Sequence, residues 1–311
     1  MTARPDRAVP ALGSPATESA TPPGLRRRTR GKAAVLLEAL SSIRQHAGST
    51  VVVKFGGAAI EEAHLADAFA QDVALLRLVG IRPVIVHGGG RQITAMAARL
   101  GLEATFVDGH RVTDEAMLEV VRMVLLGTIN QDLVSSLVLH GTPAIGLSGH
   151  DGGLLRVRPR SPELGRVGDV ERVDIDVLSH VMEKFVPVIA SIGVDECGAS
   201  YNVNADLVAG AVAAALGASK LVYVTDVPGL YDREGTFVSR ATVSECEELL
   251  ADGAATGGMI PKLTSAISAM RAGVRWSHLI DGGVEHALIL ELFTPEGFGT
   301  MLTQDGEGEP A

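Results

Sequence analysis

Cysteines and long apolar runs are scarce in this sequence, and each absence removes a class of protein. The 311 residues include two cysteines, Cys197 and Cys246, whose spacing fits neither a disulfide framework nor a metal site. This excludes a disulfide-stapled scaffold and favours a reducing, cytoplasmic environment. No apolar stretch is long and charge-free enough to span a bilayer. None of the nine histidines has the spacing of metal ligands, so we expect no metal site built from protein side chains alone.

Basic residues are also in deficit, since 27 Lys and Arg stand against 37 Asp and Glu and the formal net charge is −10. This balance argues against nucleic acid and membrane surfaces as partners. Apolar residues make up 46% of the sequence and charged residues 21%, which is enough apolar side chain for a sizeable core. The composition therefore predicts a soluble globular protein.

The two ends of the chain differ from the middle. Residues 1–31 are rich in Pro, Ala, Ser, Thr and Gly and show no helical or strand periodicity. Such a segment cannot bury enough apolar surface to offset the entropy of ordering, so we predict a disordered tail. A transit peptide is the alternative, but Asp6, Glu18 and the prolines argue against it. Residues 304–311 are predicted to be a second, acidic disordered tail.

Between the ends, short apolar runs alternate with amphipathic segments. Buried strands are predicted at 50–55, 82–87, 142–147, 186–191, 220–225 and 276–281, helices at 33–46, 61–79, 114–126, 129–139, 205–216 and 261–272, and hairpins at 103–112 and 153–174. Apolar strands that alternate with helices indicate an α/β fold with a mostly parallel sheet covered on both faces. Ligands of such sheets bind at the carboxyl ends of the strands.

Glycine runs follow two of these strands. Gly56 and Gly57 follow the first predicted strand, and Gly88, Gly89 and Gly90 follow the second, just before a predicted helix. Glycines let backbone N–H groups approach an anion, and a helix N-terminus adds partial positive charge. Tight strand-to-helix turns are the alternative for either loop alone. Neither G-x-x-x-x-G-K-[ST] nor a G-x-G-x-x-G after a strand occurs, so these loops are not those nucleotide-binding motifs.

Polar side chains stand where burial is expected. Lys54 interrupts an apolar strand, where a lysine needs a partner unless its side chain snorkels from the strand end. Asn202, Asn204 and Asp206 precede a helix, and a cap alone does not need all three, so a polar site is favoured over capping. Lys262 ends the stretch GGMIPK at the start of another predicted helix, where it is either solvated or held against an anion.

A set of motifs occurs in order between about residues 33 and 302: VVVKFGG, VIVHGGG, GHRVTD, YNVNADLVAGAVAAALGA, YVTDVPGLYD, GGMIPK and HALILELFTPEGFGTML. Together they resemble the N-acetyl-L-glutamate kinases of the amino acid kinase superfamily. The order of N-x-N-A-D, TDVPG and GGMIPK makes the resemblance highly specific. It implies a three-layer αβα sandwich with a mostly parallel central sheet of about eight strands. It also implies an N-terminal helix and acyl-amino-acid-binding lobe at 32–200 and an ATP-binding lobe at 201–303.

The resemblance implies transfer of the γ-phosphoryl group of ATP to the side-chain carboxylate of N-acetyl-L-glutamate, a step of arginine biosynthesis. A carboxylate is already ionised at neutral pH, so the reaction needs no general base. It needs positioning and cations to stabilise charge on the phosphoryl oxygens. Lys54 and Lys262 are implied as these cations, and Asp206 as the carboxylate that holds both. Mg²⁺ is expected to arrive on the ATP oxygens.

The same resemblance implies the binding residues. Those for the acyl-amino acid are Gly89, Gly90, Arg111 and Asn202, with Arg111 as the clamp of the α-carboxylate. Those for ATP are Gly56, Gly57, Thr225, Asp226, Gly229, Gly257 and Gly258. Ala58, Arg91 and His150 depart from the commoner pattern of the family. Two alternatives stay open: a kinase for aspartate, glutamate or a blocked aminoadipate, and a non-catalytic arginine-sensing homologue.

Arginine-inhibited members of this family have an extra N-terminal helix that interlaces dimers into a hexameric ring. The helix predicted at 33–46 fits this role, although Ser42 stands where an aromatic residue is typical. The implied effector residues are His286, Glu291, Gly297 and Gly299. We therefore expect a homo-oligomer, a hexamer built as a trimer of dimers or otherwise a dimer, that L-arginine inhibits.

Overall fold

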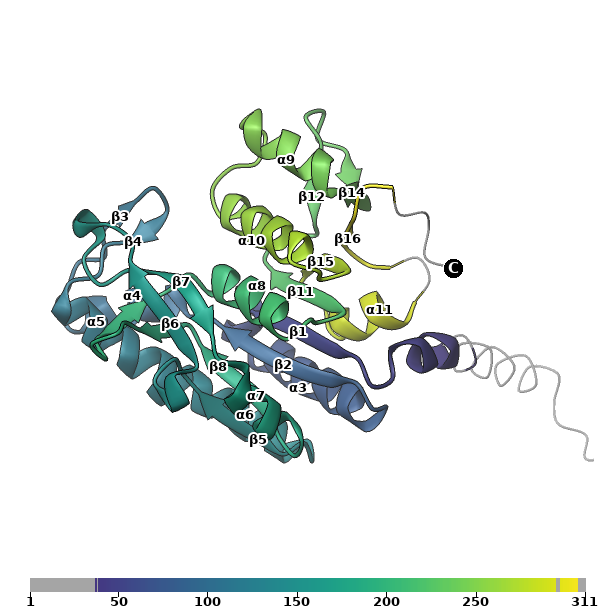
Figure 1. The fold of residues 1–311 in the computed structure, drawn as a ribbon, viewed down its shortest axis with the longest axis horizontal. Coiled ribbons are helices and arrows are strands. Elements are labelled where there is room, and N and C mark those ends of the chain that lie inside the picture. The colour runs from purple at the N-terminus through teal and green to yellow at the C-terminus, as the bar shows by residue number, and fades with distance from the viewer. Residues whose placement is uncertain (1–36, 38, 295–296, 307–311) are drawn as a thin grey trace, which may run out of the picture.

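A single eight-stranded sheet runs through the molecule (Figure 1). The computed structural model describes residues 37, 39–294 and 297–306, so the predicted tail at 1–31 and most of the one at 304–311 lie outside it. In spatial order the strands are β14 (Arg240–Thr242), β16 (Thr300–Thr303), β15 (Trp276–Asp281), β11 (Lys220–Thr225), β1 (Thr50–Phe55), β2 (Arg82–His87), β8 (Val186–Ala190) and β5 (Ala144–Leu147). Neighbours in this sheet are parallel except β15 and β16, which confirms the mostly parallel sheet.

The six predicted strands all belong to this sheet, whereas β14 and β16 were not predicted. Each of the two is short, and their sequences RAT and TMLT carry neither an apolar run nor a clear alternation. Pairing with each other and with β15, rather than local sequence, makes them strands.

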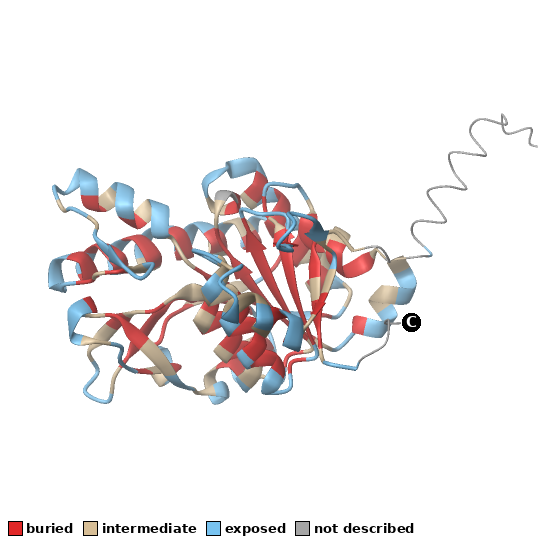
Figure 2. Ribbon diagram, turned by 90° about the horizontal axis from the view of Figure 1, so that it is seen from above, coloured by how far each residue is buried: buried red, intermediate tan, exposed pale blue. Residues whose placement is uncertain are grey.

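Helices cover both faces of the sheet, which makes three layers. One buried cluster joins the sheet to α3 (Ala63–Leu78), α4 (Gly90–Arg99), α5 (Glu115–Arg122), α6 (Asn130–Leu139) and α11 (Ala287–Phe293). The other joins it to α7 (Ile175–Met182), α8 (Ala205–Ala215), α9 (Val243–Ala251) and α10 (Met259–Arg271). Figure 2 shows the buried strands between helices whose outer faces are exposed.

Alternation along β1 decides where Lys54 points. Val51, Val53 and Phe55 belong to the first cluster and Val52 to the second. Because successive side chains on a strand point to opposite faces, Lys54 shares the face of Val52, on which α8 and α10 lie.

The predicted helices at 114–126 and 129–139 form one continuous helical segment, so the predicted break between them is wrong. The π-helix η1 (Met123–Ile129) connects α5 to α6. This wider turn places Leu125 and Ile129 directly against Gly89 in the loop after β2. At the N-terminal end, residues 39–46 are helical, and the rest of the helix predicted at 33–46 lies outside the described part of the chain apart from residue 37, which is also helical.

Both predicted hairpins are confirmed. β3 (Phe106–Val107) pairs with β4 (His110–Arg111), and β6 (Leu155–Pro159) pairs with β7 (Gly168–Val173). The second hairpin joins β9 (Ile192–Val194) and β10 (Ser200–Asn202) in a four-stranded sheet. The remaining elements are α2 (Ala58–Glu61), the 3₁₀ turns η2 (Asp151–Gly153) and η3 (Pro162–Leu164), and a hairpin of β12 (Leu230–Tyr231) with β13 (Phe237–Val238).

The large sheet is continuous across the two predicted lobes, because β1 of the first pairs with β11 of the second. The lobe boundary at residue 200 therefore remains a prediction. Among the described residues, no helix combines the length and the apolar character required to cross a membrane.

Candidate active site

The carboxyl ends of β1, β2 and β11 lie side by side, because these strands are adjacent and parallel. Their loops enclose a cavity of about 320 Å³. The predicted site residues among those that line it are Lys54, Gly56, Gly57, Gly89, Gly90, Arg111, Asn202, Asp206 and Asp226. Residues from five separate regions of the sequence thus meet at the sheet edge where the sequence predicts ligand binding.

A second cavity of about 420 Å³ lies beyond β11. The predicted residues among those that line it are Thr225, Asp226, Gly229, Gly258 and Lys262. Gly257 precedes Gly258 in the same loop and has φ 54°, a conformation that favours glycine. Asp226 lines both cavities and so lies where they meet.

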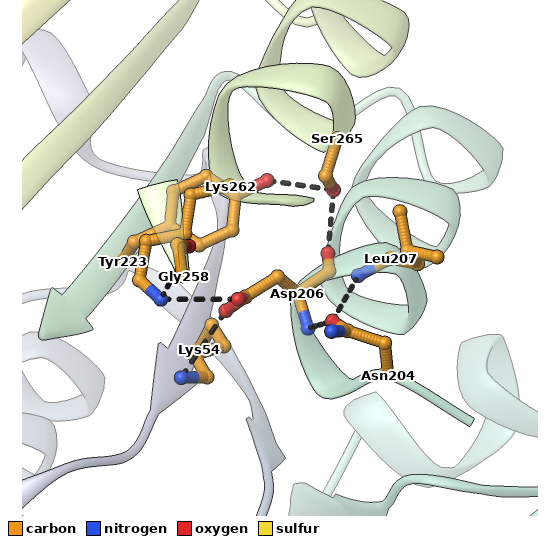
Figure 3. Close-up of polar contacts among 8 residues, drawn as sticks. All are labelled: Lys54, Asn204, Asp206, Leu207, Tyr223, Gly258, Lys262 and Ser265. Carbon is orange, nitrogen blue, oxygen red and sulfur yellow. Dashed lines mark hydrogen bonds and ion pairs between the residues drawn. The ribbon is translucent and has the colours of Figure 1, made fainter. Parts of the chain in front are cut away.

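Two lysines flank one buried carboxylate (Figure 3). Lys54 and the carboxylate line the first cavity, and Lys262 lines the second. Lys54 Nζ lies 3.1 Å from Asp206 Oδ1, an ion pair without the alignment of a hydrogen bond. Lys262 Nζ donates to Asp206 Oδ2 at 3.1 Å and to the Gly258 carbonyl oxygen at 3.3 Å. The two ammonium groups come from β1 and α10, and the carboxylate comes from the first turn of α8.

The cluster carries an excess of positive charge. Burial alone would raise the pKa of Asp206, but the ammonium groups of Lys54 and then Lys262 hold that pKa below its ordinary value, so the carboxylate is ionised at neutral pH. Burial lowers the pKa of Lys262, and Asp206 opposes that shift. Two cations around one anion, at the edge of a cavity, form a binding site for a further anion.

The backbone around Asp206 is fixed by hydrogen bonds from two directions. The Asn204 side chain caps α8 by accepting from the N–H groups of Asp206 and Leu207 at 2.8 and 3.3 Å. Ser265 Oγ donates to the Asp206 carbonyl oxygen at 2.5 Å and accepts from the Tyr223 hydroxyl at 2.8 Å (Figure 3). Ser265 is not among the predicted site residues. Its position three residues after Lys262, on the same face of one helix, is the signal that points to it.

Two predicted glycines are required by close approaches. A Cβ on Gly57, at φ 68°, would lie 1.9 Å from Asp226 Oδ1. A Cβ on Gly89 would lie 2.3 Å from Ile129 Cδ1. Asp226 at Gly57 and Ile129 at Gly89 occupy the space that a side chain would need, so backbone rather than side chain lines the cavity at both points.

Arg111 is a buried guanidinium with spare hydrogen-bonding capacity. Its Nη2 donates to the Gly90 carbonyl oxygen at 2.7 Å and to Thr94 Oγ1 at 2.8 Å, and the guanidinium stacks 4.8 Å from the centre of the Phe106 ring. Its Nη1 is buried and has no hydrogen-bond partner among the described residues. Burial lowers the pKa of Arg111. A buried donor without a partner on a cavity wall is suited to an anionic ligand.

Asn202 is linked to Arg111 through the hydroxyl group of Thr113. Asn202 Nδ2 donates to Thr113 Oγ1 at 3.2 Å, and this hydroxyl donates to the Arg111 carbonyl oxygen at 2.9 Å. The two predicted acyl-amino-acid residues are thus held in one network on the first cavity. Thr113 was not predicted, because a lone threonine in GHRVTD carries no distinctive pattern.

The predicted effector residues lie elsewhere, on and after α11. Glu291 is buried, and its Oε1 lies 2.5 Å from His278 Nδ1 while its Oε2 accepts from the N–H groups of Phe298 and Gly299 at 2.6 and 2.9 Å. Burial opposes ionisation of Glu291, but these hydrogen bonds, that of His278 first, bring its pKa to about 2. Gly297 lies next to the same carboxylate.

His286 differs from the other predicted effector residues. It has φ 60° and lies 2.6 Å from Asp72 of α3. The structure therefore brings Glu291, Gly297 and Gly299 together, whereas His286 contacts a different carboxylate.

No group of three or more His, Cys, Asp or Glu side chains among the described residues could hold a metal ion. The carboxylates of Glu61 and Asp226 on the first cavity are oxygen ligands of the kind that Mg²⁺ accepts. Arg91 already engages both carboxylates, so a magnesium ion would take most of its ligands from substrate phosphates and water.

A mostly parallel α/β sheet whose carboxyl edge carries glycine loops and an anion-binding pair of lysines defines an enzyme that handles phosphate groups. The model of the amino acid kinase family matches residues 49–281, and the chain belongs to this family. It is a kinase, as the motifs of the sequence predict.

Individual relatives agree with this assignment. The acetylglutamate kinase of Acidiphilium cryptum is 48% identical over 285 residues, which are 87% of this chain and 95% of that protein. The N-acetylglutamate synthase of Neisseria gonorrhoeae, in complex with coenzyme A and N-acetyl-glutamate, superposes with a TM-score of 0.79 at 27% identity over 88% of this chain. Its complex with coenzyme A and L-arginine gives a TM-score of 0.75 at 26% identity over 87% of this chain. The match spans 64% and 65% of those two chains.

Proposed function

We propose that this protein transfers the γ-phosphoryl group of ATP to the side-chain carboxylate of N-acetyl-L-glutamate, a step of arginine biosynthesis that gives N-acetyl-L-glutamyl 5-phosphate. The observation that carries the proposal is the pair of ammonium groups held at 3.1 Å from Asp206, between the two cavities. The 48% identity to an acetylglutamate kinase supports this choice of acceptor.

The chemistry needs little from the protein beyond position and charge. The ionised acceptor carboxylate attacks the γ-phosphorus, a new P–O bond forms, and the bond to the β-phosphate oxygen breaks to release ADP. Lys54 and Lys262 stabilise the charge on the phosphoryl oxygens during transfer. Asp206 is ionised and engaged by both lysines, so it acts as their holder and not as a general base.

The two cavities suggest how the substrates are arranged. The acyl-amino acid occupies the first cavity, where the unpartnered Nη1 of Arg111 takes its α-carboxylate and Asn202 holds it from the other side. ATP occupies the second cavity, and its phosphates extend past Asp226 toward Lys54. Mg²⁺ bound together with ATP would supply further charge neutralisation.

Trapping the product with hydroxylamine tests the proposal. N-acetyl-L-glutamate and ATP together should give a hydroxamate, and omission of either should give none. Aspartate, glutamate and a blocked aminoadipate, assayed in parallel, distinguish kinases for related carboxylates. A protein that forms no acyl phosphate with any of them and still binds arginine would be the non-catalytic sensor, against which the Lys54–Asp206–Lys262 cluster argues.

We further propose that the enzyme is a cytoplasmic homo-oligomer, a hexamer built as a trimer of dimers or otherwise a dimer, that L-arginine inhibits at Glu291, His286, Gly297 and Gly299. The solved arginine complex of the related synthase supports an arginine effector. His46, in the helical segment at 39–46, lies with its ring centre 6.5 Å from that of Trp276 at the start of β15, two residues before His278. The helix predicted to interlace dimers thus touches the strand that carries the partner of Glu291.

Because both Glu291 oxygens already accept hydrogen bonds, an arginine guanidinium has to replace at least one of those contacts. Light scattering and an arginine titration of the activity test both halves of the proposal. A hexamer that Glu291→Ala renders insensitive to arginine would support them. A dimer whose rate is unchanged by millimolar arginine would contradict them.

A further inference from the structure

Arg91 joins three segments of the chain at the first cavity. It lies in the first turn of α4 and lines the cavity. Its Nη1 lies 3.1 Å from Glu61 Oε2 at the end of α2, and its Nη2 lies 3.1 Å from Asp226 Oδ2 just after β11. One planar guanidinium therefore connects the loops that follow β1, β2 and β11.

The contact of Arg91 with Asp226 lies on the proposed path of the ATP phosphates. Asp226 lies where the two cavities meet, and its other carboxylate oxygen takes the place that a Cβ on Gly57 would need. By holding Asp226 through Oδ2, Arg91 keeps the carboxylate pressed against the glycine loop. Asp226 therefore stands where the two cavities meet with one of its oxygens engaged by Arg91.

The position of Arg91 is poor for the helix that carries it. A cation in the first turn opposes the helix dipole, and the side chain is 63% exposed, so burial gives little in return. Its contacts are instead with two carboxylates that face the cavity, Glu61 and Asp226. Without a cation between them, these carboxylates would repel the phosphate chain of a nucleotide that passes from one cavity to the other.

We propose that Arg91 is a positioning residue for the phosphates of ATP. Its guanidinium cancels the charge of Glu61 and Asp226, and it clamps the glycine loop after β1 to the loop after β11. The inference rests on the proposed function, because it takes ATP as the occupant of the second cavity. Arg91 acts through the two carboxylates. Unlike Lys54 and Lys262, it does not itself stabilise the transferred group.

Calorimetric titration with MgATP, in the absence of acceptor, measures this role separately from turnover. Arg91→Gln should raise the Kd for MgATP about tenfold, the scale of one uncompensated charge near the site, and change the KM for N-acetyl-L-glutamate less than about twofold. Arg91→Lys keeps the positive charge but loses the planar guanidinium that reaches both carboxylates, so it should recover part of the affinity for MgATP. Arg99→Gln, at an exposed residue in the last turn of the same helix, is the matched control and should bind MgATP normally.

Removing one carboxylate tests the mechanism directly. In the Arg91→Gln background, Glu61→Gln should restore severalfold of the lost MgATP affinity, because a repelling charge disappears with its missing partner. An unchanged Kd for Arg91→Gln, or no recovery in the double variant, would overturn the inference about Arg91. In that case, ATP binding by the unsubstituted protein would leave the proposed function standing. No binding of MgATP by the unsubstituted protein would overturn both.

Discussion

Two buried carboxylates, Asp206 and Glu291, lie near opposite ends of the strands, and comparing them separates a charge-unbalanced cluster on a cavity from a balanced, enclosed one. Asp206 lies near the carboxyl ends of β1 and β11, between Lys54 and Lys262. Glu291 accepts from His278, whose Nε2 lies 3.5 Å from Lys220 Nζ at the start of β11. Both clusters thus place a carboxylate in a chain of basic side chains inside the protein.

Charge balance and exposure distinguish the two clusters. Burial, and then Lys220, lowers the pKa of His278, so this ring is neutral at pH 7 and the Lys220–His278–Glu291 chain carries about equal positive and negative charge. The Lys54–Asp206–Lys262 cluster has one cation in excess, and its residues line the cavities. A balanced, enclosed cluster stabilises the fold, whereas an unbalanced one on a cavity binds an anion.

The sharpest test of this difference replaces one lysine in each cluster. Lys262→Met should lower kcat by about a hundredfold or more, the scale of losing a preorganised charge donor in the transition state. Lys220→Met should leave kcat within about threefold and lower the melting temperature, because Glu291 then has a net charge without compensation. Steady-state kinetics and thermal unfolding of both variants make the comparison. Near-normal turnover in Lys262→Met would make that lysine a surface residue and remove the basis of the proposed function.

A glycine at each end of the sheet gives the second test. Gly57 follows β1 with φ 68°, and Gly80 precedes β2 with φ 87° and has open space where a Cβ would lie. Alanine at either position strains the backbone by about 1 kcal/mol, but only at Gly57 does the methyl group meet Asp226. Gly57→Ala should lower kcat/KM about tenfold or more, and Gly80→Ala should lower only stability. Equal kcat/KM values for the two variants would show that the close approach of Asp226 to Gly57 does not affect catalysis.

The sequence predicts this architecture well where one pattern determines one element. Six strands are continuous apolar runs, and their parallel order places the glycine loops, Lys54 and Asp226 at one edge. β14 and β16 are strands because of pairing across the chain, which no local pattern records. The π-helical turn joins two helices that sequence periodicity separates at residues 127–128, because its hydrogen bonding changes the register that the periodicity assumes.

The candidate site shows the same limit. The family motifs identify Lys54, Asp206 and Lys262, and the structure places them together. The basic members of the Glu291 cluster could not be predicted, because His278 precedes Glu291 by 13 residues and Lys220 by 71, and neither stands in a motif. A side chain's role follows from its neighbours in space, and these depend on the whole fold.

A comparison of Arg111 with Arg166 tests a smaller effect, that on the KM for the acyl-amino acid. Each guanidinium stacks on an aromatic ring, Phe106 for Arg111 and Tyr201 for Arg166, but only Arg111 lines the first cavity with an unpartnered buried nitrogen. Arg111→Lys keeps the charge and loses the fork, so the KM for N-acetyl-L-glutamate should rise about tenfold and that for ATP less than about twofold. Arg166→Lys should change neither by more than about twofold. Equal increases in both KM values for Arg111→Lys would indicate a folding defect.

The smallest expected effect on activity concerns Glu291, whose role in the balanced cluster is measured by acid stability. Its pKa is about 2 in the folded protein, below the value in an unfolded chain. A depressed folded pKa contributes stability that is present above the unfolded pKa and is lost as pH falls toward the folded one. In the absence of arginine, Glu291→Gln should therefore keep kcat near normal at pH 7 and cost about 2 kcal/mol of unfolding free energy, since Phe298 and Gly299 lose a charged acceptor.

Urea unfolding at a series of pH values checks this prediction. The difference in unfolding free energy between the wild type and Glu291→Gln should be constant between about pH 7 and pH 5. Below about pH 4 it should shrink by about 1.4 kcal/mol per pH unit, because the wild type loses the advantage of its ionised carboxylate and the glutamine variant does not. A difference that stays constant down to pH 3 would mean that the carboxylate is not held ionised by His278 and the two backbone N–H groups, and the contrast with Asp206 would then rest on exposure alone.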